Sequence, residues 1–206
     1  MNVLLLNGSP NPRGCTFSAL QEVAVQLQDN GIEAEIVQLG KTPVLGCVAC
    51  RECAQGGKCV YGDKDVNPFA EKLREADGLV IGSPVYYASP NGALLSFLDR
   101  LFFSSAGLFA YKPGAAVVSA RRAGTTAALD VLNKYFLLSN MPLVPSQYWN
   151  MVHGYEPDQV RLDLEGLQTM RVLGNNMAWI IKSIKSGEPP PATEKPRLLT
   201  NFHDGK

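Results

Sequence analysis

The sequence predicts one α/β domain built on a parallel β-sheet, because short apolar runs of strand character alternate with segments of helical periodicity. The chain has 206 residues, enough for one domain with a full hydrophobic core but with little room for a second. We therefore expect a sheet that helices cover on both faces. The five predicted strands lie at residues 3–6, 34–39, 78–81, 115–119 and 143–145.

The helices between these strands are predicted from apolar residues at helical spacing and from the residues that flank them. One stripe begins at Phe17, and a longer one runs from Leu167 to Ile184. Gly31 and residues 76–78 end the first two helices, whereas residues 90–92 and 124–126 begin the next two. The predicted order is βαβαβαβαβα.

Right-handed crossovers leave few arrangements for five strands in that order. At this length we expect a flavodoxin-like three-layer αβα sandwich, with a five-stranded parallel sheet of order 2-1-3-4-5. The domain is expected to span residues 1–186 and to carry a cysteine-rich loop at residues 43–63. Three consecutive prolines and the loss of periodicity after Gly187 predict a C-terminal tail at residues 187–206.

The charge balance argues against nucleic acid and anionic membranes as partners. Lys plus Arg and Asp plus Glu each number 19, so the formal net charge is zero. The apolar run at residues 3–6 is too short for a signal peptide, and no run approaches the ~20 apolar residues of a membrane span. We therefore expect a cytoplasmic protein.

The loop after the first strand, residues 7–18, is rich in Gly, Pro, Ser and Thr and ends where a helix begins. Such a loop directs backbone N–H groups and hydroxyls toward the positive end of the helix, where an anion binds. It lacks the Gly-Lys-Ser/Thr ending of a triphosphate loop and the G-x-G-x-x-G spacing of a dinucleotide loop, which favours a single terminal phosphate. The alternative is an ordinary strand-to-helix loop.

Two further loops follow the third and fourth strands and are expected at the same edge of the sheet. In the order 2-1-3-4-5, the first and third strands are neighbours whose connections diverge, which creates a ligand crevice. Tyr86 and Tyr87 offer flat walls for a planar ring, or else pack at a helix start. Arg121 and Arg122 are either a solvated face or a positive charge beside that ring.

These loops resemble the NADPH-dependent FMN reductase family, over roughly residues 1–185. The resemblance lies in Gly8-Ser9-Pro10, in Gly82-Ser83-Pro84-Val85-Tyr86 with Asn91-Gly92, and in Ala120-Arg121-Arg122-Ala123-Gly124. It implies FMN as cofactor. The FMN phosphate would be held by Ser9, Asn11, Thr16, Phe17 and Ser18. The ring would be lined by Pro84, Val85, Tyr86, Tyr87 and Asn91, and its pyrimidine edge approached by Arg121, Arg122 and Gly124.

Four of the five cysteines form the pattern C-x2-C-x2-C-x5-C, namely Cys47, Cys50, Cys53 and Cys59. Such closely spaced thiolates suit a compact iron–sulfur cubane, whereas structural zinc sites usually take two separated C-x2-C pairs. The pattern resembles the iron–sulfur flavoproteins of the same fold family, which implies one [4Fe–4S] cluster. Zinc, and free thiols or a disulfide, remain alternatives.

Together these features predict an FMN-dependent oxidoreductase that passes electrons from NAD(P)H through FMN to a small acceptor such as a flavin or a quinone. No acid–base catalytic group is expected, because flavin chemistry asks the protein mainly for position and electrostatics. An iron–sulfur flavoprotein that carries electrons between redox proteins is the alternative, and a thiol-based redox sensor is a third. The apolar helix at residues 94–103 predicts a homodimer or homotetramer.

Overall fold

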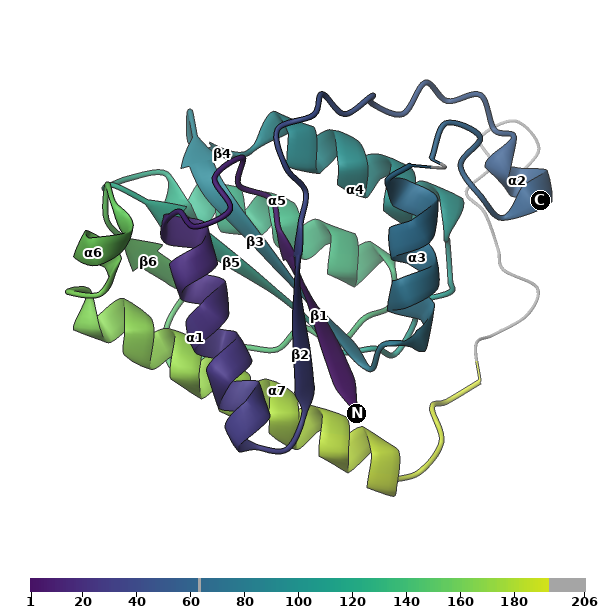
Figure 1. The fold of residues 1–206 in the computed structure, drawn as a ribbon. Coiled ribbons are helices and arrows are strands. Elements are labelled where there is room, and N and C mark those ends of the chain that lie inside the picture. Colours follow the sequence, from purple (N-terminus) through teal and green to yellow (C-terminus); the bar gives the residue numbers. More distant parts are fainter. Residues whose placement is uncertain (63, 193–206) are drawn as a thin grey trace, which may run out of the picture.

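The fold is described from a computed structural model, in which residues 1–62 and 64–192 are described. Helices and strands alternate along the chain in the predicted manner (Figure 1). The strands are β1 (Asn2–Asn7), β2 (Glu33–Gln38), β3 (Gly78–Tyr86), β4 (Ser89–Pro90), β5 (Gly114–Ala120) and β6 (Met151–His153). The helices are α1 (Cys15–Asp29), α2 (Cys53–Gly56), α3 (Val66–Glu75), α4 (Gly92–Ser104), α5 (Thr125–Leu138), α6 (Pro157–Val160) and α7 (Leu164–Ser186).

The sheet confirms the predicted topology. Its parallel strands follow the order β2-β1-β3-β5-β6, and β4 pairs antiparallel with the end of β3 outside this path. Counted without β4, this is the order 2-1-3-4-5 of a flavodoxin-like sheet. The carboxyl ends of β1, β3 and β5 therefore meet at one edge of the sheet (Figure 1).

Alternate residues of the buried strands divide the core into two halves, which confirms the three layers. In β1, Val3 and Leu5 pack with α1 and α7, whereas Leu4 and Leu6 pack with α3, α4 and α5. This period of two arises because successive side chains of a strand point to opposite faces. Both faces of the sheet are consequently apolar and covered.

The fifth strand differs from the prediction. Residues 143–145 form a single bridge, between Leu143 and Gly114, and the strand itself is β6. The Gly114 N–H donates to the Pro142 carbonyl and its carbonyl accepts from the Val144 N–H, both at 2.9 Å. Pro142 has no N–H, so it cannot donate the hydrogen bond that would extend the ladder on the N-terminal side of this bridge. The chain rejoins the sheet only where Met151 pairs with Val118.

Three short elements were not predicted, namely β4, α2 and α6. The proposed boundary before the tail coincides with the end of α7 at Ser186. Tyr111 donates a hydrogen bond of 2.8 Å to the Pro191 carbonyl, while the remainder of the predicted tail, residues 193–206, lies outside the described residues. None of the described helices is long and apolar enough to span a membrane.

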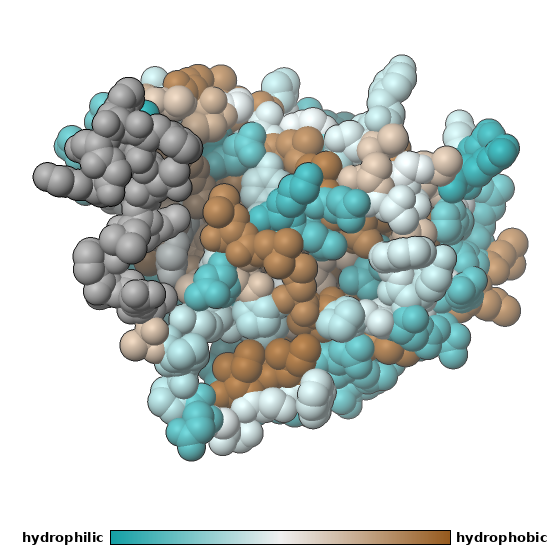
Figure 2. Space-filling view, turned by 180° about the vertical axis from the view of Figure 1, so that it is seen from behind, coloured by the Kyte–Doolittle hydropathy of each residue, from teal (hydrophilic) through white to brown (hydrophobic). Residues whose placement is uncertain are grey.

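The apolar helix α4 is largely covered by its own chain. Leu94, Leu98 and Leu101 are fully buried, whereas Phe103 at its end is 57% exposed. Seen from behind, the surface carries apolar patches separated by polar residues (Figure 2). The apolar surface of α4 is therefore mostly buried without a second subunit. The expected homo-oligomer stays a prediction.

Candidate functional site

The loop between β1 and α1 turns tightly against the end of β3. The Gly8 N–H donates to the Gly82 carbonyl at 2.8 Å, and the Ser9 N–H donates to Asn7 Oδ1 at 3.1 Å. A Cβ atom at Gly8 would lie 2.5 Å from Leu94 Cδ2 and 2.9 Å from the Gly82 oxygen. Only glycine fits this close approach of two backbones.

Helix α1 begins at this loop with its first turn free of capping side chains. Its N-cap residue is Gly14, no side chain caps this end, and the first turn carries no acidic residue. The N–H groups of a first helical turn lack partners within the helix and carry the positive end of its dipole. This end of α1 is therefore suited to bind an anion.

The residues predicted to hold a phosphate surround that turn, but their side chains differ in availability. Thr16 is only 1% exposed, and its hydroxyl lies 2.8 Å from that of Ser119 on β5. Ser9 Oγ accepts the Asn11 N–H at 3.1 Å, so it shapes the loop. Asn11 is exposed and Phe17 and Ser18 are half-buried.

The second loop forms a tight hairpin between β3 and β4. Tyr87 and Ala88 occupy its turn with φ angles of 51° and 58°, as a two-residue hairpin turn of type I′ requires. Tyr86 and Tyr87 are exposed, whereas Pro84 and Val85 are half-buried. Both tyrosine rings are thus accessible to a ligand. Their exposure argues against the alternative that they pack at the start of a helix.

Asn91 connects this hairpin with the first loop. Its Oδ1 caps α4 by accepting the Ala93 N–H at 3.0 Å, and its Nδ2 donates to the Gly8 carbonyl at 2.7 Å. Its own N–H donates to Ser83 Oγ at 3.0 Å. One side chain therefore fixes the relative position of two loops and a helix.

The third loop joins the same assembly through Gly124. This residue has a φ angle of 86°, and a Cβ atom added to it would lie 2.7 Å from Ala88 Cα. Arg121 and Arg122 are exposed beside it. We call the three loops, residues 7–14, 82–91 and 120–124, the ligand edge.

One buried polar group beside β5 was missed by sequence reasoning: the Asn150 carbonyl accepts the Val118 N–H at 3.0 Å. Asn150 precedes β6 and is buried, and its Oδ1 is the one buried side-chain oxygen or nitrogen without a hydrogen-bond partner in the described chain. Such an acceptor calls for a donor from a ligand or water. Nothing in the local sequence distinguishes this asparagine from a loop residue.

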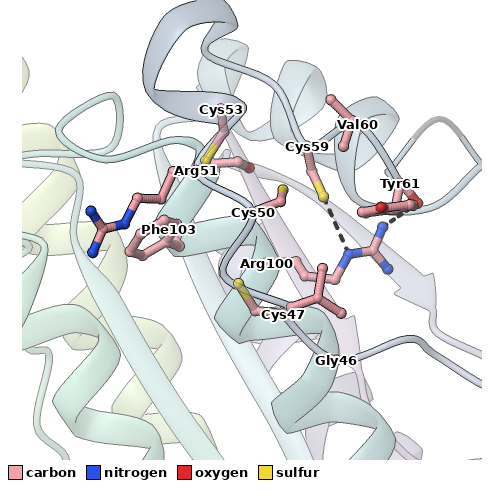
Figure 3. A pocket seen from close by; sticks show the side chains of 12 residues that line it. Gly46, Cys47, Cys50, Arg51, Cys53, Cys59, Val60, Tyr61, Arg100 and Phe103 are labelled. Carbon is pink, nitrogen blue, oxygen red and sulfur yellow. Dashed lines mark hydrogen bonds between the residues drawn. The ribbon is translucent and has the colours of Figure 1, made fainter.

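A second candidate site lies where the cysteine-rich loop crosses α4. Cys47, Cys50, Cys53 and Cys59 all line one hollow, which we call the cysteine pocket (Figure 3). All five cysteines of the chain are free thiols in this structure. Across residues 1–62 and 64–192, no three His, Cys, Asp or Glu side chains converge closely enough to form a ready-made metal site.

The thiols in the pocket influence one another. Burial raises the pKa of the Cys53 thiol, and the neighbouring Cys50, Cys59 and Cys47 raise it further. A metal or cluster that binds here must therefore displace the proton of the Cys53 thiol, whose raised pKa disfavours its loss. The pocket has the donor chemistry for such a group, although its sulfur atoms are not arranged as ligands.

Arg100 on α4 forms the wall of the cysteine pocket, and sequence reasoning did not single it out. It is 3% exposed, and its Nε donates to Cys59 Sγ at 3.4 Å (Figure 3). Nη1 and Nη2 donate to Asp65 Oδ2 and Oδ1 at 3.1 and 3.2 Å. Burial opposes the charge, but the contacts with Cys59 and Asp65 outweigh it and raise the pKa of Arg100. The sequence did offer one signal for this residue. Arg100 stands within the apolar run 94–103, and a charge that is buried in such a helix requires partners.

Cys59 is also held through its backbone. The Asn67 side chain on α3 accepts the Cys59 N–H at 3.0 Å and donates to its carbonyl at 2.9 Å. Cys59 is therefore fixed from α3 through its main chain and from α4 through its sulfur.

Comparison with known proteins identifies the family of the chain. The profile of the family described as NADPH-dependent FMN reductase matches residues 1–156. The chain belongs to this family. It is therefore an oxidoreductase of the flavin reductase type. An iron-sulfur flavoprotein of Methanocaldococcus jannaschii is 32% identical over 193 residues, which cover 90% of this chain and 100% of that protein.

Solved structures of low sequence identity share the fold of this FMN reductase family member. A flavodoxin from the domain Archaea superposes with a TM-score of 0.61 at 15% identity, covering 88% of this chain and 99% of that one. An NAD(P)H:quinone oxidoreductase from Methanothermobacter marburgensis gives 0.64 at 17% identity, covering 86% and 96%. These likenesses confirm the flavodoxin-like fold.

Proposed function

We propose that the protein binds FMN at the ligand edge and passes electrons from NAD(P)H to a small acceptor such as a flavin or a quinone. The observation that carries this proposal is the joining of three loops by Asn91 and Gly124 beside the uncapped end of α1. FMN supplies the capacity to accept a hydride and to release electrons one or two at a time. The protein supplies position and charge.

The phosphate of FMN would be held chiefly by backbone N–H groups. Thr16 would contribute its N–H, because its hydroxyl is occupied by Ser119, and Phe17 would do the same. The hydroxyls of Ser9 and Ser18 and the amide of Asn11 would complete a neutral set of donors. Neutral donors at a helix N-terminus are the usual means of binding a terminal phosphate.

The flavin ring would lie between the β3–β4 hairpin and residues 120–124, which we call the arginine loop. Pro84, Val85, Tyr86 and Tyr87 would form its walls, and Asn91 would fix the floor beneath them. Arg121, Arg122 and Gly124 would approach the pyrimidine edge. A cation there favours the reduced, anionic flavin.

We further propose that the cysteine pocket holds one [4Fe–4S] cluster, with Cys47, Cys50, Cys53 and Cys59 as ligands. Four thiols around one hollow are the donor set that such a cluster needs. Ala49 and Arg51, on either side of Cys50, have φ angles of 54° and 63°. Left-handed residues that are not glycine cost about 1–2 kcal/mol each, and a bound group offsets this strain. The name of the archaeal relative supports the proposal.

Anaerobic purification followed by flavin, iron and sulfide analysis tests both cofactors. We expect one FMN and about four irons and four sulfides per chain. Zinc, or thiols without metal, would contradict the cluster and leave the flavin proposal standing. A colourless protein that takes up no FMN would contradict the whole proposal.

Steady-state kinetics with NADH or NADPH and a quinone test the reaction. Donor and acceptor would use the ligand edge in turn, so the double-reciprocal lines should be parallel. Intersecting lines would contradict a shared face.

A second candidate function is electron transfer between redox proteins without direct oxidation of NAD(P)H. The exposed thiols Cys47 and Cys50 favour it, because a cluster at the surface is accessible to a protein partner. It predicts absent or slow oxidation of both nicotinamides by protein that contains flavin and iron. We further propose a cytoplasmic location, because cysteines clustered as proposed cluster ligands are typical of reducing compartments.

A further inference from the structure

We propose that Arg100 is the positioning residue of the cysteine pocket: it joins the two ends of residues 47–59, which we call the cysteine loop, and directs a fixed positive charge at Cys59. The inference rests on the proposed cluster for its effect on electron transfer. Its effect on the loop itself does not depend on a cluster.

Every N–H of the guanidinium is used. Nε donates to Cys59 Sγ, Nη1 to Asp65 Oδ2 and to the Leu45 carbonyl at 3.3 Å, and Nη2 to Asp65 Oδ1 and to the Tyr61 carbonyl. An arginine has five such donors in a planar fork, so none is left over.

These acceptors lie on both sides of the cysteine loop. Leu45 precedes the first cysteine, whereas Tyr61 and Asp65 follow the last one. Arg100 therefore joins the two ends of a loop that has only one short helix, α2, between them. Holding the ends together reduces the conformational entropy that binding four ligands to one group would otherwise cost.

The charge is also oriented. Asp65 accepts from the two terminal nitrogens, while Nε faces Cys59 (Figure 3). The ion pair is thus a dipole with its positive end at one of the four sulfur atoms. Hydrogen bonds and positive charge at a ligating sulfur stabilise the more negative, reduced state of a cluster and raise its reduction potential.

Lysine cannot reproduce this arrangement. Its ammonium has three donors on a flexible stem and cannot contact Asp65 side-on while reaching Leu45, Tyr61 and Cys59. Arg100→Lys therefore retains the charge and loses the closure, whereas Arg100→Gln loses both.

The test compares Arg100→Lys and Arg100→Gln with Arg51→Gln as a charge-matched control. Arg51 also lines the cysteine pocket, but its side chain is exposed, its guanidinium points away from the sulfur atoms (Figure 3), and none of the described hydrogen bonds joins it to a cysteine. Two quantities are measured: amide hydrogen exchange of residues 45–62 in metal-free protein, and the reduction potential of the cluster in anaerobically purified protein. Flavin content and thermal melting show whether each variant is folded.

We expect both Arg100 variants to exchange amides of residues 45–62 at least tenfold faster than the wild type, and Arg51→Gln to resemble the wild type. In Arg100→Gln the ratio of reduced to oxidised cluster at a fixed potential should fall about tenfold, or ~59 mV for one electron. Asp65→Asn should raise it, because the opposing charge is removed. A folded Arg100→Gln that assembles no cluster, while Arg51→Gln does, supports the closing role.

Unchanged exchange in folded Arg100 variants overturns the closing role. Equal potentials in the wild type and Arg100→Gln, or shifts of the same sign in Arg100→Gln and Asp65→Asn, overturn the electrostatic role. Absence of iron from the wild type contradicts the proposed cluster instead, and the exchange data then decide the closing role alone.

Discussion

The ligand edge and the cysteine pocket are organised in opposite ways. The ligand edge consists of short loops at the ends of buried strands, joined to one another by backbone contacts such as Gly8 to Gly82. The cysteine pocket lies on a long segment between β2 and α3 with one short helix. The first is placed by the sheet, whereas the second depends on a few side chains that reach it from α3 and α4.

This difference indicates what each site requires of its ligand. A site made of strand ends is largely preformed, so binding there needs little further ordering. A loop held by a few side chains reaches its final geometry only when a metal or cluster binds, because such binding free energy is also folding free energy. We therefore expect the two sites to respond independently to mutation.

The largest effect should separate the two sites completely. Cys53→Ala is expected to reduce iron and sulfide to less than about a tenth of the wild type, because a cubane needs all four thiolates. Flavin content should not change. Cys15→Ala is the matched control, since Cys15 lies on α1 outside the pocket, and its iron content should equal the wild type. Parallel loss of flavin and iron in Cys53→Ala would contradict independence.

The next effect concerns the ligand edge. Gly8→Ala places a methyl group 2.5 Å from Leu94 Cδ2 and should lower the free energy of unfolding by about 2 kcal/mol, with FMN bound at least tenfold more weakly. Gly92→Ala is the control, because its Cβ would meet nothing within 4 Å. Urea unfolding and FMN titration measure both. Equal stability of the two variants would show that the loops are not tightly joined.

A smaller effect is expected from the arginine loop. Arg121→Gln combined with Arg122→Gln should lower the reduced-to-oxidised ratio of bound FMN about threefold at low salt, because exposed charges act weakly and are screened. Arg74→Gln on α3, far along the chain from these loops, should leave the ratio unchanged. A spectroscopic redox titration decides, and no difference between the variants would remove the arginines from the ring site.

The smallest effect should appear at the opposite end of the strands. Burial alone would raise the pKa of Asp77, but hydrogen bonds from Lys185 and from the Asn2 N–H outweigh it and lower the pKa. The Asp77 carboxylate stabilises the fold fully at pH values above its pKa in the unfolded chain, which is ~4. That contribution is lost as the pH falls through its lower pKa in the folded protein. Asp77→Asn should lower the free energy of unfolding by about 0.5 kcal/mol at pH 7 and flatten the acid side of the stability profile. An unchanged acid profile would contradict this.

The sequence was sufficient for the fold because each strand and each helix carries its own local pattern. The exception, residues 143–145, is apolar like a strand but forms one bridge, and the preceding Pro142 has no N–H with which to extend it. Apolar composition alone does not report whether N–H groups are available for a ladder.

The candidate sites were predicted only in part, for a physical reason. Loop residues such as Ser9 and Cys59 stand in short motifs that the sequence displays directly. Arg100 and Asn67 act on the cysteine loop from 41 and 8 residues away, and Asn150 stands out only by its burial. Such partners are defined by packing between distant segments, which a local pattern does not contain.

Helix α4 contributes to both sites, with Asn91 capping its start and Arg100 near its end. The two residues are separated by about 14 Å of regular helix, at 1.5 Å per residue. In the proposed arrangement, with FMN at the ligand edge and a cluster in the cysteine pocket, this helix would help to set the separation of the two electron carriers, because it connects residues that hold both sites.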